Sequence, residues 1–389
     1  MHPGDRAETQ TTGMALLSRS LFRLLASAAV MSLAPAAADG AQSRPFTRDD
    51  ARTIIANVQK IVTPDGIDTN VAVPINGTQQ WITVRGRDSH NPILLFIHGG
   101  PAAPEMPTSW TFQNDWEDFF TVVEWDQRGA GKTYNANDPA KIAPTLKVSQ
   151  MEQDTDAMVR YLRAAYHKNK IFVLGHSWGS FLGLSLAQRH PEWLYAYVGI
   201  GQMIDTAQSE RLDYDATLKK AEAAHNAEAV KELEAIAPYV GADGSLSLAK
   251  VNIERKWSVV FGGLSYGRSS YDYYYNTARL SPDYTDADVD AIDKGSALSL
   301  PHFVKGFGDA NFTNVTSFRC PIVIFQGRHD ETTSSVVVAR WFPHVHAPYK
   351  KLVWFENSAH MVQIEEPGRV LLHLVEDVLP LASAKPSGQ

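Results

Sequence analysis

A serine in a glycine-flanked turn is the first residue whose surroundings suggest nucleophilic chemistry. Residues 175–179 read Gly-His-Ser-Trp-Gly, an apolar run at 171–174 leads into them, and a helical pattern follows from Ser180. A serine on a sharp turn between a strand and a helix exposes its hydroxyl, and glycines flank it because side chains there would clash. We therefore predict that Ser177 is a nucleophile, with a purely structural glycine-rich turn as the alternative.

A serine hydroxyl is a weak nucleophile at neutral pH, so a base and an acid that orients the base must lie near it. The apolar run 322–325 leads to Asp330, and the run 352–355 leads to His360. The chain order Ser177, Asp330, His360 is the order expected in a sheet enzyme with this type of turn. We predict that these three residues form the catalytic set.

Other acids and histidines compete for these two roles. Glu331 directly follows Asp330 and is the alternative acid. The rival histidines neighbour the acid, lie outside a strand end or belong to the last predicted helix: His329, His344, His346 and His373. His360 is preferred because it follows the final predicted strand.

Acyl transfer also needs N–H donors for the oxygen that becomes negatively charged. One donor is predicted to be the backbone N–H of Trp178, the residue after the nucleophile. The other is expected from the loop after the run 93–97, which reads His-Gly-Gly-Pro at 98–101. Proline has no N–H, so Gly99 or Gly100 must supply it, and Gly100 is preferred. The alternative is a tight turn whose glycines only permit packing.

Two further runs do not meet the requirements of a ligand site. In the stretch 125–133, Asp126 stands where a phosphate-binding loop needs its first glycine, so we expect Asp126 and Arg128 to support the turn. His344 and His346 have no third metal ligand nearby in the sequence. We predict no metal and no cofactor.

An alternation of apolar runs and helical patterns positions the candidate residues. Continuous apolarity is typical of strands buried on both faces of a sheet. Such runs occur at 93–97, 120–125, 171–174, 197–200, 322–325 and 352–355, with helical patterns such as 151–166 and 180–189 between most of them. Before them, Thr47 caps a helix that runs towards Val62, and strands at 70–73 and 80–84 form a hairpin. The pattern predicts an α/β fold with a mostly parallel, doubly wound sheet.

The alternation breaks between residues 205 and 311. This stretch contains a helical pattern at 218–236 and several tyrosines near residue 273, with no further apolar run of the earlier type. We interpret 205–311 as a helical cap inserted into a core formed by 39–204 and 312–389.

The first 38 residues resemble a secretory signal peptide. Arg19 and Arg23 precede an apolar run at 24–34, and small residues precede a cleavage site after Ala38. Met14 is an alternative start. The apolar run is too short to span a bilayer as a helix, so we predict an exported, periplasmic or secreted protein without stable membrane insertion.

Composition excludes several other classes of protein. The 36 basic and 43 acidic residues give a net charge of −7, and no basic run suggests binding to nucleic acid. Cys320 is the single cysteine, so a disulfide framework is excluded. The predicted partner is a small-molecule or short-peptide substrate.

Taken together, the motifs resemble the α/β-hydrolase superfamily, and within it the prolyl aminopeptidase (proline iminopeptidase) group of serine peptidases. The resemblance rests on His-Gly-Gly-Pro at 98–101, Asp-Gln-Arg-Gly-Ala-Gly at 126–131, Gly-His-Ser-Trp-Gly-Ser at 175–180, and the late Asp330 and His360. It implies an α/β-hydrolase fold with an inserted helical cap that shapes the substrate pocket. It also implies Ser177 as nucleophile with Asp330 and His360 as its partners.

The chain departs from that group at two places. Ala102 stands where the family usually has glycine, and the cap lacks the Trp-Glu pair of a family whose acidic cap residues hold the substrate's amine. The nearest stretch is 254–260, where Glu254 could replace the acid, although a solvated helix face is the simpler interpretation. The candidates for substrate contacts are Glu254, Trp257, Tyr273 and Tyr274.

The predicted function is an exported serine hydrolase that cleaves a small peptide or amide through an acyl-enzyme. A carboxylesterase or lactonase is the alternative favoured by the missing Trp-Glu pair and the tyrosine-rich cap. A non-catalytic binding protein on the same fold is the remaining alternative, because a fold alone does not establish a function.

Overall fold

The computed structural model describes residues 44–307 and 310–383. Residues 44–46 belong to a separate N-terminal unit, and the sheet and its helices belong to the unit Thr47–Gln389. The predicted signal peptide lies outside the described residues. Within the described ranges, no helix combines the length and apolarity that crossing a membrane requires.

The N-terminal elements agree with the sequence pattern apart from one helix end. Helix α1 (Arg48–Val58) begins with the predicted cap Thr47, which forms a capping box with Asp50 in which each side chain bonds the other residue's backbone N–H. It ends at Val58 rather than near Val62, ahead of a proline at residue 64 that disfavours helix in the residue before it. Strands β1 (Ile67–Ile75) and β2 (Thr78–Gly86) then form the predicted antiparallel hairpin.

The remaining six strands form the predicted parallel sheet. They are β3 (Ile93–Ile97), β4 (Thr121–Asp126), β5 (Ile171–His176), β6 (Leu194–Ile200), β7 (Ile322–Gly327) and β8 (Lys350–Phe355). In the described part of the chain the eight strands have the order β1-β2-β4-β3-β5-β6-β7-β8. All pairs from β4 to β8 are parallel, so the carboxyl ends of these strands meet at one edge. The α/β fold class is confirmed.

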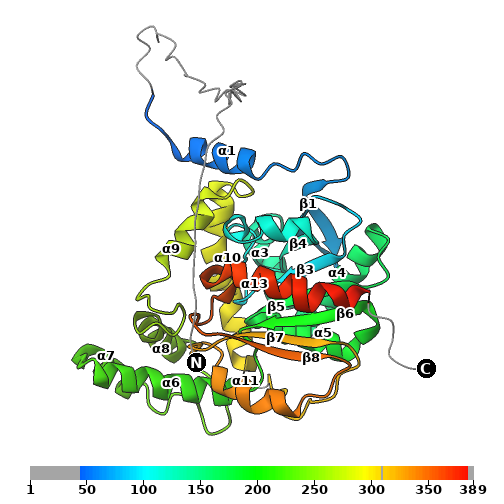
Figure 1. Cartoon of the computed structure of the whole chain (residues 1–389). Coiled ribbons are helices and arrows are strands. Elements are labelled where there is room, and N and C mark those ends of the chain that lie inside the picture. Colours follow the sequence, from blue (N-terminus) through cyan, green and yellow to red (C-terminus); the bar gives the residue numbers. More distant parts are fainter. Residues whose placement is uncertain (1–43, 308–309, 384–389) are drawn as a thin grey trace, which may run out of the picture. The chain divides into compact units, whose positions relative to one another are not determined.

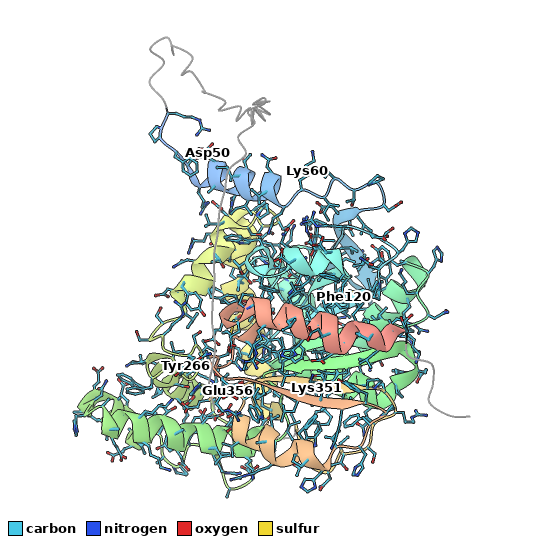
Figure 2. The ribbon with its side chains drawn as sticks, viewed as in Figure 1. Asp50, Lys60, Phe120, Tyr266, Lys351 and Glu356 are labelled. Carbon is cyan, nitrogen blue, oxygen red and sulfur yellow. The ribbon has the colours of Figure 1, made fainter. Side chains whose placement is uncertain are left out.

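Helices cover both faces of this sheet, which explains the continuous apolar runs. In β3, Leu95 and Ile97 face one core while Leu94 and Phe96 face the other. The first core is covered by α4 (Val148–Ala165), α5 (Trp178–Arg189) and α11 (Ser335–Trp341), and the second by α13 (Pro367–His373). Phe120, labelled in Figure 2, is fully buried in the second core.

Short helices complete the core. They are α2 (Gly131–Asn135), α3 (Pro139–Ile142) and α12 (Val362–Glu365).

Between β6 and β7 in the sequence, the chain forms a group of helices, which lies at one side of the sheet in Figure 1. They are α6 (Thr206–Ala223), α7 (Ala227–Ala235), α8 (Leu248–Val260), α9 (Asp272–Tyr275) and α10 (Asp286–Phe307). Helices α6, α7, α8 and α10 share an apolar cluster of their own. The two ends of the segment meet where Asp205 pairs with Asn311 in an antiparallel bridge.

The prediction of one helix over 218–236 is wrong. The chain breaks between α6 and α7, where His225 adopts φ +53° and Asn226 caps α7 by accepting the N–H of Ala229. The amphipathic pattern continues across the break because both helices turn an apolar side towards the same cluster.

Candidate active site

The predicted nucleophile occupies a strained turn between β5 and α5. Ser177 has φ +53° and ψ −120°, a conformation that residues other than glycine seldom adopt. Its N–H donates to the carbonyl of Ile200 at the end of β6, at 3.0 Å. Strain of this kind is typical of a nucleophile turn, since it pushes the hydroxyl out at the sheet edge.

The two flanking glycines are required by close backbone approach. A Cβ on Gly175 would lie 2.3 Å from the carbonyl oxygen of Gly179, and one on Gly179 would lie 1.8 Å from that of Ile97. These separations are far below any real contact, so the turn forms only with glycine at both places.

The structure brings the predicted acid and base together at the same edge. His360 Nδ1 lies 3.1 and 3.0 Å from the two carboxylate oxygens of Asp330. Asp330 also accepts the N–H groups of Thr332 and Thr333, both at 2.9 Å, and an N–H of Gln326 at 3.0 Å. An acid held this way is fixed in orientation and can fix the imidazole in turn.

Burial and these contacts set the ionisation of the pair. Burial by itself would raise the pKa of Asp330, but His360 and the N–H donors outweigh it and lower that pKa. Burial lowers the pKa of His360 in spite of Asp330. The pair therefore favours an ionised acid beside a neutral imidazole, which is the state a general base needs.

Gly201 is a residue that sequence reasoning missed. It follows β6 with φ +54°, and a Cβ there would lie 2.8 Å from the His360 ring. The position of a glycine directly after a predicted strand was the available signal. Without a side chain, Gly201 leaves room for the imidazole beside the nucleophile turn.

The predicted oxyanion donors lie next to the nucleophile. A Cβ on Gly99 would be 3.1 Å from the Ser177 Cβ, so the loop after β3 passes beside the serine. The N–H of Gly99 donates to Glu105 Oε2 at 3.3 Å, whereas within the described chain the N–H groups of Gly100 and Trp178 bond to no protein acceptor. The Trp178 side chain is buried against Phe303, with ring centres 5.1 Å apart.

Two cavities meet at the nucleophile, and Gly100, Ser177 and Thr332 line both. The cap cavity runs under α8 and α10. Its apolar wall is formed by Met203, Leu248, Val251, Leu300, Val304 and Phe307. The tyrosine cavity is bordered by Tyr271, Tyr274 and Tyr275, and His360 also lines it.

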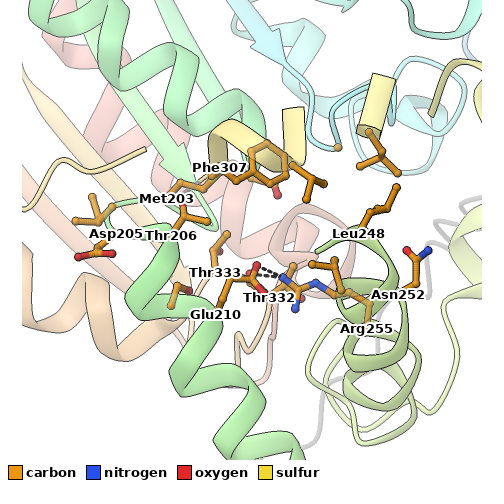
Figure 3. A pocket seen from close by; sticks show the side chains of 17 residues that line it. Met203, Asp205, Thr206, Glu210, Leu248, Asn252, Arg255, Phe307, Thr332 and Thr333 are labelled. Atoms are coloured by element: carbon orange, nitrogen blue, oxygen red, sulfur yellow. Dashed lines mark hydrogen bonds and ion pairs between the residues drawn. The ribbon is translucent and has the colours of Figure 1, made fainter. Parts of the chain in front are cut away.

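Charged residues close one side of the cap cavity (Figure 3). Arg255 bonds Glu210 at 2.5 Å and also pairs with Glu254, while the Tyr239 hydroxyl donates to Glu210 at 2.6 Å. Two buried carboxylates therefore share one guanidinium, and Asp205 adds a further carboxylate to the lining. The lining of the cap cavity therefore includes two carboxyl groups, those of Asp205 and Glu210, and one guanidinium.

The four residues predicted to contact substrate do not lie together in the structure. Tyr274 lines the tyrosine cavity, where its hydroxyl bonds Thr108 Oγ1 at 3.1 Å. Tyr273 lies next to it, bonded to Ser265 Oγ at 3.1 Å, and is not part of either lining. Trp257 packs in the cluster of the inserted helices and donates to Glu232 at 2.8 Å.

The expectation of a solvated helix face at Glu254 is wrong. A solvated helix face was the simpler interpretation of this residue, but its side chain is fully buried. It accepts the Thr217 hydroxyl at 3.0 Å, pairs with Arg255 and lines neither cavity. The sequence pattern of this helix could not show the burial of Glu254, because a buried carboxylate beside an arginine has the same pattern as a charged surface. Glu210 and Arg255, which do line the cap cavity, were not predicted.

A second histidine–carboxylate pair lies beside the first and was also missed. His176, directly before the nucleophile, has Nδ1 2.5 Å from Glu105 Oε1. Its Nε2 lies 3.1 Å from the carbonyl oxygen of His360, and the two imidazole rings are 4.8 Å apart. His176 and Glu105 both border the tyrosine cavity.

Three of the alternative acid and base candidates, Glu331, His329 and His373, are engaged elsewhere. Glu331 bonds Lys220 at 2.6 Å, His329 contacts the carbonyl of Glu356 at 3.2 Å, and His373 pairs with Asp377 at 2.7 Å. Within the described ranges, no three His, Cys, Asp or Glu side chains are grouped so as to hold a metal ion.

The supporting role expected for the run after β4 is visible in its contacts. Arg128 forms two bonds to the buried Asp154, at 2.7 and 3.0 Å, and Asp126 accepts the N–H of Lys132 at 2.7 Å. Tyr284, from the inserted segment, donates to Asp126 and so links this turn to the helices above it.

Comparison with known proteins defines the class. A family model described as alpha/beta hydrolase fold matches residues 92–367. The chain is 29% identical over 299 residues to a Bacillus subtilis protein described as "Probable aminopeptidase YbaC", covering 75% of this chain and 91% of that one. It is 28% identical to the proline iminopeptidase of Neisseria gonorrhoeae over 300 residues, covering 74% and 88%.

A solved structure agrees at the level of the fold. The proline iminopeptidase of Mycobacterium smegmatis superposes with a TM-score of 0.55 at 18% identity, covering 81% of this chain and all of that one. The chain belongs to the α/β-hydrolase fold family. Within that family it is a hydrolase related to the prolyl aminopeptidase group.

Proposed function

We propose that this protein is a serine hydrolase that cleaves small peptides or amides with a free amino group through an acyl-enzyme. The observation that carries the proposal is Ser177, which lies on a strained turn where two cavities meet and lines one of them together with His360, the partner of Asp330. His360 would take the Ser177 proton as the hydroxyl oxygen attacks the carbonyl carbon. It would then return that proton to the leaving amine, and water would release the acyl group by the same steps.

The N–H groups of Gly100 and Trp178 are proposed to bind the oxyanion. The Gly99 N–H is engaged by Glu105, so Gly100 is the free donor in that loop. Donors that are already oriented stabilise the developing charge without reorganisation during the reaction.

The negative charge of the cap cavity supports an amine-bearing substrate. Glu210 and Asp205 line the cavity that begins at Ser177, and Arg255 is divided between Glu210 and Glu254. A protonated amine near Glu210 would complete the charge balance, with Glu210 in the role that the family resemblance assigns to acidic cap residues. An amine held by a buried carboxylate also gives strong selectivity, because a substrate without it leaves the acid unpaired.

Ser177→Ala tests the nucleophile. We expect loss of turnover of proline β-naphthylamide and of p-nitrophenyl esters, together with loss of fluorophosphonate labelling. A Ser177→Ala protein with unchanged turnover would exclude this mechanism, and a folded parent protein inert to every substrate and probe would favour a binding protein.

Glu210→Gln tests the amine site. We expect KM for an aminoacyl amide to rise at least about tenfold, as expected for loss of a charged hydrogen bond, with little change for an uncharged ester. Glu331→Gln is the matched control, since Glu331 pairs with Lys220 outside both linings. Equal effects of Glu210→Gln on both substrates would argue against amine recognition there.

Ester or lactone hydrolysis is the second candidate, favoured by the apolar wall of the cap cavity. Short acyl esters would place their chain along Leu248, Val304 and Phe307. Brisk cleavage of such esters, with no release of proline from its naphthylamide, would decide for this candidate.

Export is proposed from the N-terminal sequence alone. After expression of the full chain in a Gram-negative host, we expect the periplasmic fraction to contain a product that begins at Asp39. A cytoplasmic product that retains the first 38 residues would contradict this.

A further inference from the structure

The second histidine–carboxylate pair is a buried charged group that the proposed mechanism does not use. Glu105 is 2% exposed and His176 is 3% exposed, and they contact each other through Oε1 and Nδ1. Burying a charged pair is costly unless its remaining hydrogen-bonding atoms are also satisfied. The remaining atoms of this pair do find partners, and those partners lie in the catalytic loops.

Each end of the pair reaches a different catalytic loop. The other Glu105 oxygen accepts the N–H of Gly99 in the oxyanion loop, at 3.3 Å. The other His176 nitrogen lies 3.1 Å from the backbone carbonyl of His360. His176 itself precedes Ser177, so one buried contact joins the oxyanion loop, the nucleophile turn and the loop of the base.

The partners also fix the protons on His176. A carbonyl oxygen can only accept, so Nε2 must carry a hydrogen. Nδ1 lies 2.5 Å from Glu105 Oε1 and 3.4 Å from the amide nitrogen of Gln363, and the shorter contact, to an ionised Glu105, requires a hydrogen on Nδ1 as well. The ring is therefore an imidazolium when Glu105 is ionised. Burial lowers the pKa of His176, but Glu105 and the carbonyl of His360 outweigh burial and raise it.

We propose that Glu105 and His176 are positioning residues, which hold the oxyanion loop and the catalytic histidine in register with Ser177 and keep a positive charge beside His360. This inference rests on the proposed function of Ser177 and His360. It assigns a role in the reaction to a pair that the proposed proton transfer between Ser177 and His360 does not use.

The charge on His176 acts on His360 together with several other groups. Asp330 contacts the His360 ring directly, Arg255 approaches from α8, and Glu365 on α12 accepts the N–H of Ala359 next to it. Asp330 favours the protonated imidazole, while His176 and Arg255 disfavour it. Removing the charge on His176 should therefore make His360 easier to protonate.

His176→Phe keeps the ring and removes both N–H donors. We expect kcat to fall by about 10- to 100-fold, the usual cost of a misplaced catalytic group, with little change in KM. The acidic limb of kcat/KM should move to higher pH, because that limb reports protonation of His360 in the free enzyme. A residue that only stabilised the fold would not move this limb.

Glu105 supplies an independent comparison. Glu105→Ala loses both bonds and should lower kcat like His176→Phe. Glu105→Gln should restore most of it, because a carboxamide oxygen can accept the Gly99 N–H while its NH₂ donates to Nδ1 of a neutral His176. If His176→Phe does not fold, equal kcat values for Glu105→Ala and Glu105→Gln would overturn the proposal.

The rates are to be expressed per active site titrated with a fluorophosphonate, so that unfolded protein does not count. A His176→Phe enzyme with the parent's kcat and the parent's acidic limb would overturn the proposal. Ser177→Ala separates the two levels: if it abolishes labelling while His176→Phe has no effect, the proposed function stands and only the positioning role is wrong.

Discussion

Two buried histidine–carboxylate pairs lie with their imidazole rings 4.8 Å apart, and their surroundings give them opposite proton preferences. In Asp330–His360, the N–H groups of Thr332, Thr333 and Gln326 stabilise the ionised acid. The pKa of His360 is lowered, first by burial. In Glu105–His176, both ring nitrogens face acceptors, and the pKa of His176 is raised although burial opposes it.

The comparison shows that residue type does not decide which histidine is the base. His360 has one ring nitrogen on its acid and borders the cavity at Ser177, so it can take up a proton. The nitrogens of His176 are both occupied by acceptors within the protein. Environments that separate the pKa values of similar groups are a general sign of divided roles in an active site.

Asp330→Asn disrupts the Asp330–His360 pair, and of these variants it should have the largest effect on kcat. An amide cannot hold the imidazole in the tautomer that accepts the Ser177 proton, and we expect kcat to fall by roughly 10⁴-fold. The measurement is ester and aminoacyl-amide turnover. Glu331→Gln, one residue along, should retain activity, and comparable losses in the two variants would contradict the assignment of Asp330.

Gly201→Ala should displace His360 without changing its chemistry. The new Cβ would lie 2.8 Å from the ring at a backbone angle of φ +54°, and we expect kcat to fall by about 10- to 100-fold. Gly77→Ala is the control, because Gly77 also has positive φ (+80°) but no atom within 4 Å of its added Cβ. Equal kcat values for these two variants would show that the ring tolerates displacement.

The pH profile of the parent enzyme should report the depressed pKa of His360. The base must be neutral to accept a proton, so a pKa below the ordinary value of 6.5 keeps kcat/KM above half of its maximum at pH 6.5. Activity should reach its half-maximal value only at a lower pH. A half-maximal kcat/KM at or above pH 6.5 would contradict the predicted direction.

His373→Gln should have the smallest effect on activity. His373 pairs with Asp377 at 2.7 Å beneath the sheet's second core, away from both cavity linings. We expect unchanged kcat and pH profile, with a loss of unfolding free energy of about 1 kcal/mol in urea denaturation. A change in the pH profile would show that distant histidines also tune His360, and would weaken the comparison between the two central pairs.

The sequence by itself determined the α/β fold class, because doubly buried strands and amphipathic helices have periodicities that can be read locally. It also identified Ser177, Asp330 and His360 as candidates, since each follows a predicted strand and parallel strands bring their carboxyl ends to one edge. The structure then placed Asp330 and His360 in contact. Their catalytic roles stay predictions until tested.

Only the tertiary structure decided which charged residues face the nucleophile. Glu105, Glu210 and Arg255 come from a loop, from α6 and from α8, and no local pattern distinguishes them from solvated charges. His176 ends β5 beside the nucleophile, but its sequence position does not reveal its carboxylate partner. Glu254 shows the same limit from the other side, since its helix resembles a surface helix although the side chain is fully buried. Contacts between distant segments depend on packing, and burial, hydrogen-bond partners and pKa follow from those contacts.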